Sequence, residues 1–78
     1  MAHRFTEEIK RFRVEGGAEY TDGNLNWGQR MFKSVVVEAS DALTAKQKAR
    51  LLFVEEWIKN KNPDENLLKL HTDYVVEL

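Results

Sequence analysis

The complete absence of cysteine is the strongest constraint on how this 78-residue chain can fold. Without cysteine it can form neither a disulfide framework nor a thiolate zinc site, so apolar packing must stabilise it. A chain of this size buries only about 60–65% of its unfolded surface, so its stability is marginal. Hydrophobic residues make up 42% of the sequence and charged residues 32%, which suffices for one core. We predict a single domain over residues 1–78.

The same features predict a cytoplasmic protein. Small secreted folds usually depend on disulfides, which this chain cannot form. Residues 1–5 lack the apolar run of a signal peptide, and no segment approaches the roughly 18 apolar residues needed to span a bilayer. We expect no membrane insertion.

The spacing of apolar residues predicts an all-α fold, a small bundle of three to four short helices. The third helix has the broadest apolar face, and Thr44 is suited to cap it. Pro63 is suited to the first turn of the fourth helix. In chain order, the predicted helices cover residues 4–15, 25–39, 44–60 and 63–77.

The first forty residues also allow a second interpretation. Residues 12–14, Phe-Arg-Val, alternate as in a strand, and the β-branched run of residues 35–37 lowers helix propensity. The alternative is an α+β fold with a short N-terminal hairpin within residues 8–38. Gly16 and Gly17 are predicted to form a flexible turn.

No arrangement of residues indicates catalysis or metal binding. His3 and His71 lie near opposite ends of the chain, and Asp73 would point to a different helix face from His71. We expect His71 to be a partly buried histidine with satisfied hydrogen bonds. Ser34 and Ser40 lack the Gly-x-Ser-x-Gly elbow of an activated nucleophile. We therefore predict no catalytic residue, no metal site, no cofactor and no enzymatic activity.

A surplus of large apolar residues in the last two predicted helices indicates a protein interface, because four short helices cannot bury them all. We expect a small, non-enzymatic protein-binding module that acts as an accessory factor or inhibitor by covering a surface of a larger partner. The surplus is also compatible with a homodimer. Such chains are typical of accessory proteins of phages and mobile elements. The interface candidates are Leu51, Val54, Trp57, Ile58, Tyr74, Val75 and Leu78.

A basic run on the third predicted helix supports an alternative function. Lys46, Lys48 and Arg50 follow a connection and an upstream helix, which is the order of a helix-turn-helix. The alternative hypothesis is a small dimeric DNA-binding regulator of this type. We rank nucleic acid below protein as the partner because the formal net charge is -1.

Charge is unevenly distributed along the chain. Basic residues dominate its start, with Lys10, Arg11 and Arg13, and acidic residues dominate its end, with Asp73 and Glu77. Opposite charges attract, so we expect the two ends to approach each other, within one chain or between two.

Overall fold

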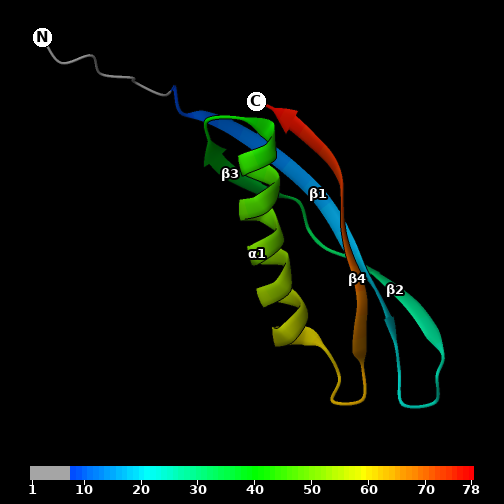
Figure 1. Ribbon diagram of the computed structural model, residues 1–78. Coiled ribbons are helices and arrows are strands. Elements are labelled where there is room, and N and C mark those ends of the chain that lie inside the picture. The colour runs from blue at the N-terminus through cyan, green and yellow to red at the C-terminus, as the bar shows by residue number, and fades with distance from the viewer. Residues whose placement is uncertain (1–7) are drawn as a thin grey trace, which may run out of the picture.

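The computed structural model describes residues 8–78, which form a four-stranded antiparallel sheet covered on one face by a single helix (Figure 1). The all-α prediction is therefore wrong, and the described part of the chain is not a helical bundle. In chain order, the elements are β1 (Lys10–Thr21), β2 (Trp27–Met31), β3 (Val35–Ala39), α1 (Ala42–Asn60) and β4 (Asn66–Glu77).

The central strand of the sheet is β1. One of its edges pairs with β4 from Phe12, opposite Glu77, to Thr21, opposite Asn66. The other edge is shared, because β3 pairs with the first half of β1 and β2 pairs with the second half. All three pairings are antiparallel, so β1 holds every other strand in place.

Alternation along the start of β1 explains why it is a strand rather than part of the predicted helix 4–15. Phe12 and Val14 are buried under α1, whereas Arg11 and Arg13 are exposed. This period of two is that of a sheet with one covered face. Residues 4–7 of that predicted helix lie outside the described residues.

Gly16 and Gly17 lie in the interior of β1 and do not form the predicted turn. A Cβ atom on Gly16 would collide with the carbonyl oxygen of His71 and lie 2.9 Å from Cε2 of Phe53. A Cβ atom on Gly17 would lie 2.6 Å from the carbonyl oxygen of Arg30. Glycine is therefore required here because neighbouring backbone and the helix approach β1 closely.

The segment predicted as the helix 25–39 contains β2 and β3 instead. Residues 35–37, three consecutive valines, favour the extended backbone of β3. The alternative hairpin within residues 8–38 rested on residues 12–14 and 35–37, which lie in β1 and β3 and pair with each other. The alternative did not identify β2, which pairs with the same edge of β1 as β3 does.

The loop between β1 and β2 is organised by Asp22. Its Oδ1 accepts hydrogen bonds from the backbone N–H groups of Asn24, at 2.8 Å, and Asn26, at 2.9 Å. Gly23 N–H reaches Oδ2 of Asp64 at 3.3 Å, so this loop contacts the turn between α1 and β4. Figure 1 shows the two loops at the same end of the molecule.

The predicted helix 63–77 is replaced by β4. Its register with β1 shifts twice, and each shift inserts one extra residue into β4. Leu67 and Leu70, which pair with inward-facing residues of β1, are consequently three residues apart, as are His71 and Tyr74 on the opposite face. Because a β-bulge changes a spacing of two into a spacing of three, β4 carries the apolar pattern of a helix.

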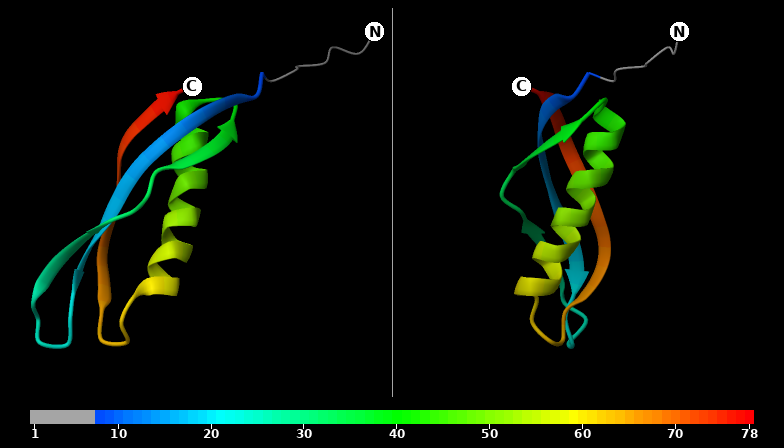
Figure 2. Two further views of the ribbon diagram at one scale, coloured as in Figure 1. Left: turned by 180° about the vertical axis from the view of Figure 1, so that it is seen from behind. Right: turned by 90° about the vertical axis from the view of Figure 1, so that its left-hand side faces the viewer.

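The helix α1 contains the predicted helix 44–60. Its N-cap is Asp41, not Thr44, and the Asp41 Oδ1 accepts a hydrogen bond of 2.7 Å from the Thr44 N–H. The strands diverge from the helix toward its C-terminal end (Figure 2). The buried residues are accordingly small alanines near the start of the helix and larger aromatic residues further along it. Its buried stripe consists of Ala45, Ala49, Phe53 and Trp57.

The expected attraction between the basic start and the acidic end occurs within the chain. Lys10 Nζ lies 3.8 Å from Oε1 of Glu77, across the ends of β1 and β4. The two side chains are 37% and 56% exposed to solvent, so this ion pair contributes little to stability.

The N-cap makes stability depend on pH. The N–H of Thr44 hydrogen-bonds the ionised carboxylate of Asp41 and lowers the pKa of that group. The ionised cap therefore stabilises the fold above its unfolded-state pKa of about 4, and this contribution is lost as pH falls through the lower folded-state pKa. Asp41→Asn keeps a capping oxygen but cannot titrate.

When the pH is lowered from about 6 to about 2, we expect the thermal midpoint of the wild type to decrease relative to that of Asp41→Asn. Thermal unfolding followed by circular dichroism at several pH values measures this difference. A difference that stays constant over the range would contradict the role of the charged cap.

Candidate binding surface

Within residues 8–78, no element covers the sheet face opposite α1, which we name the open face (Figure 2). Large apolar side chains on this face are between 45% and 65% exposed. They come from β2, β3 and β4, and their pairing with outward-facing residues of β1 assigns them to this side. They are Trp27, Met31, Val36, Tyr74 and Val76.

The apolar side chains of the open face come from the strands on both sides of β1, and an outward-facing residue of β1 lies between those that share a row. Neighbouring strands are about 5 Å apart, so side chains in one row touch. Gly17 has no side chain, and the sulfur of Met31 lies 2.8 Å from the position that a Cβ atom would take there. Two cross-strand rows of this face are Val36–Arg13–Val76 and Met31–Gly17–His71, and the pair Glu15–Tyr74 lies between them.

Charges of both signs are distributed over the open face. Arg11 lies opposite Glu38, and Glu19 lies opposite Lys69. Opposite charges in direct cross-strand pairs stabilise a sheet and cancel much of each other's field. The paired strand positions of this face carry the bases Arg11, Arg13 and Lys69 and the acids Glu15, Glu19 and Glu38.

Three of the predicted interface residues belong to the core or border it. Trp57 is only 3% exposed and forms part of the core under α1. Val54 and Val75 are partly buried and pack against the same core. These three side chains stabilise the fold and offer little area to a partner.

The other four predicted interface residues are exposed but do not form one surface. Leu51 and Ile58 lie on the side of α1 that faces away from its buried stripe. Tyr74 lies on the open face, and Leu78 lies at the end of β4. Their role as interface residues stays a prediction, and of the four only Tyr74 joins the cluster of the open face.

Two of the three basic residues of the predicted DNA-binding helix contact their own sheet. Lys48 Nζ donates a hydrogen bond of 2.6 Å to the carbonyl oxygen of Glu38, and Arg50 Nη1 donates one of 3.4 Å to that of Leu70. Lys46 is half-buried. A helix-turn-helix needs two consecutive helices, and the described residues contain one. DNA binding itself stays a prediction, without the geometry that motivated it.

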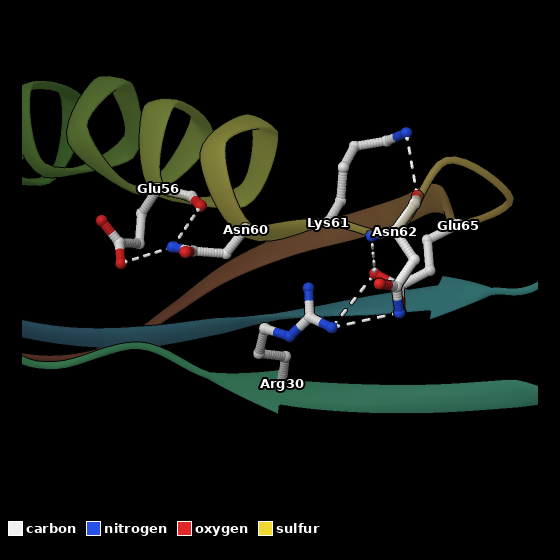
Figure 3. A network of polar contacts seen from close by, with 6 residues as sticks. All are labelled: Arg30, Glu56, Asn60, Lys61, Asn62 and Glu65. Atoms are coloured by element: carbon white, nitrogen blue, oxygen red, sulfur yellow. Dashed lines mark hydrogen bonds and ion pairs between the residues drawn. The ribbon is translucent and has the colours of Figure 1, made fainter.

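A partly buried ion pair lies at the far end of the covered face (Figure 3). Nη2 of Arg30 lies 3.0 Å and 3.1 Å from the two carboxylate oxygens of Glu65. Asn62 donates two further hydrogen bonds to this carboxylate, from its backbone N–H at 3.2 Å and its side-chain amide at 3.1 Å. Glu65 is 5% exposed, and these donors compensate for the cost of burying its charge.

Two aromatic rings complete the surroundings of Arg30. Its guanidinium carbon lies 5.2 Å from the ring centre of Tyr20 and 5.0 Å from that of Trp57. The two rings are 5.3 Å apart, so the three groups form a triangle with cation–π contacts. We name Tyr20, Arg30, Trp57, Asn62 and Glu65 the Arg30 cluster, and it joins β1, β2, α1 and the turn before β4.

His71 and Asp73 interact because they lie in a strand rather than in the predicted helix. Nδ1 of His71 lies 2.9 Å from Oδ1 of Asp73. The histidine side chain is 17% exposed, so it is partly buried as expected. Its Nε2 is buried without a hydrogen-bond partner among the described residues, so only one ring nitrogen is satisfied.

A groove of about 320 Å³ lies between α1 and the connection from β2 to β3. Its floor contains the stacked rings of Phe32 and Phe53, whose centres are 5.2 Å apart. Its rim carries Lys33 and Lys59 together with Glu56. These groups belong to the solvated edge of the groove and do not converge on one point.

No three histidine, cysteine, aspartate or glutamate side chains among residues 8–78 are placed to hold a metal ion. In the same part, α1 is too polar to cross a membrane as a helix.

No protein-family model matches the sequence, and neither the curated proteins nor the solved structures gave a significant match.

The Arg30 cluster predicts a specific coupling between two side chains. Glu65→Leu leaves the guanidinium of Arg30 without its counter-ion. We expect it to lower the free energy of unfolding by about 2–3 kcal/mol, less than for a fully buried pair. The expected loss of stability is smaller than for a fully buried pair because the Arg30 side chain is 28% exposed to solvent.

The Arg30→Met/Glu65→Leu double variant should lose less stability than the sum of the two single changes, because neither charge is left alone. Urea unfolding of all four proteins measures this coupling. Glu56→Gln is the control, since Glu56 lies on the exposed side of the same region and should change stability by less than about 0.5 kcal/mol. Strict additivity would show that the two charges act independently.

Proposed function

We propose that this protein is a non-catalytic binding module that covers a surface of a larger protein partner with its open face. As an accessory factor or inhibitor in the cytoplasm, it would act by occupying that surface rather than by chemistry. The observation that carries the proposal is the cluster of half-exposed apolar side chains on the open face.

The composition of the open face supports a protein as the partner. Tryptophan, tyrosine, methionine and arginine are the residues enriched in protein interfaces, and Trp27, Tyr74, Met31 and Arg13 all lie on this face. Acids and bases are interspersed among them, which favours a partner surface that is apolar with charges of both signs. A nucleic-acid surface would instead require an excess of bases to neutralise phosphates.

The outer side of α1 is a weaker candidate for the same role. Its exposed apolar residues are Leu43, Leu51, Leu52 and Ile58. Leu43 lies eight positions, about 12 Å along the helix, from Leu51, and the side chain between Leu51 and Ile58, Val54, is partly buried against the core. All of them are aliphatic, without the aromatic, methionine and arginine side chains of the open face. Single exposed apolar residues are ordinary on protein surfaces.

Site-specific photo-crosslinking in the cells that naturally produce the protein tests the proposal. A photoreactive residue at Val36 on the open face should form an adduct with a defined protein, whereas one at Leu43 on α1 should not. An adduct shows proximity but not specific binding. The captured protein is therefore purified, and its affinity for the wild type is measured.

Trp27→Ala and Met31→Ala should each weaken this purified complex at least about tenfold, as expected for the centre of an interface. Leu51→Ala, an exposed leucine on the other side of the molecule, should change the affinity less than about twofold. Adducts that form only from α1, no adduct from the open face, or equal effects of the three substitutions would contradict the proposal.

A further inference from the structure

Two side chains with metal-binding atoms meet over Gly17 on the open face. Met31 on β2 and His71 on β4 are the cross-strand neighbours of this glycine. The sulfur of Met31 lies 2.8 Å, and Cε1 of His71 lies 3.1 Å, from the position that a Cβ atom would take on Gly17. Because glycine has no side chain, a thioether and an imidazole approach the same point from opposite sides.

One ring nitrogen of His71 can act as a ligand at this point. Nδ1 lies 2.9 Å from Oδ1 of Asp73, and a carboxylate can only accept a hydrogen bond, so Nδ1 carries the proton. In the neutral ring, Nε2 then presents a lone pair. Nε2 is bonded to Cε1, and among residues 8–78 it is buried without a hydrogen-bond partner. Buried polar atoms are normally satisfied, so this lone pair indicates a ligand.

We infer that Nε2 of His71 and Sδ of Met31 bind a soft monovalent metal ion, Cu(I). The site lies on the open face, but it needs no protein partner and does not rest on the proposed function.

The two ligand atoms favour Cu(I) over harder ions. Thioethers select Cu(I), and imidazole binds copper as well as zinc. A single pair of soft donors suffices for Cu(I), which accepts linear coordination. Zinc requires a tetrahedral set of histidine, cysteine or carboxylate ligands, and no such group occurs among residues 8–78.

One ligand is held in place and the other can adjust. Asp73 fixes the orientation of the His71 ring, and a carboxylate bonded to the second nitrogen is the usual support of a metal-binding histidine. Met31 is 58% exposed, and its rotatable bonds allow the sulfur to move onto the metal ion. Asp73 is therefore a positioning residue of the site.

The charges around Gly17 attract a cation. Glu15 and Glu19 are the outward-facing residues of β1 on either side of this glycine, and Asp73 adds a third acid. The paired positions of the same rows contain one lysine, Lys69, opposite Glu19, and no arginine. The local excess of acids favours a positive ion at this point.

Anaerobic titration of the full chain with Cu(I), kept reduced by ascorbate and buffered by a competing chelator, tests the site. One equivalent should bind, and NMR should show shifts of the Met31 methyl group and of the His71 ring. Zn(II) should not produce these shifts.

Met31→Leu keeps the size and apolar character of the side chain but removes the sulfur, so the fold should persist. We expect it to raise the dissociation constant for Cu(I) at least about tenfold. Asp73→Asn should raise this constant about tenfold because the histidine loses its charged support. Circular dichroism checks that both variants are folded.

Two controls separate this site from other effects. His3→Ala, which removes the other histidine of the sequence, should bind Cu(I) as tightly as the wild type. Trp27→Ala should do the same, although it should weaken the complex with a protein partner. No Cu(I) binding, an affinity that Met31→Leu leaves unchanged, shifts confined to other residues, or an equal response to Zn(II) would overturn the inference.

Discussion

Pairing along both edges of β1 is the constraint on which the rest of the structure depends. One edge fixes β4 and the other fixes β2 and β3, so the whole sheet forms around this strand. Phe12 and Val14 then face α1, while the arginines between them face the other side. Gly16 and Gly17 let the neighbouring strands and Phe53 approach the middle of β1. The open face and the approach of Met31 and His71 over Gly17 both follow from this arrangement.

Local patterns made the helix predictable, and non-local pairing made the sheet difficult to predict. The residues of α1 that face the core repeat every four positions, which is visible in the sequence alone. The pairs of β1 with β4 join residues 45 to 65 positions apart, from Thr21 with Asn66 to Phe12 with Glu77. Their contacts leave no local signal, and the two bulges gave β4 the spacing of a helix.

The candidate binding surface was likewise predicted only in part. The sequence indicated more large apolar residues than the fold could bury, and exposed Tyr74 belongs to that surplus. It placed Trp57 at an interface, although the close pairing of α1 with the sheet buries it. The Arg30 cluster was missed, because Tyr20, Arg30 and Glu65 are distant in sequence and meet only once the strands pair. Outward-facing alternation in β2 and β3 was the available signal for the open face.

Native-state amide hydrogen exchange, with cross-strand contacts assigned by NMR, tests the central role of β1 most directly. The account predicts that the amides of β1 are protected on both edges and exchange most slowly, and that Val14 contacts Val75 and Ala18 contacts Leu70. Helical contacts through residues 63–77, or β1 amides that exchange as fast as those of the loops, would contradict it.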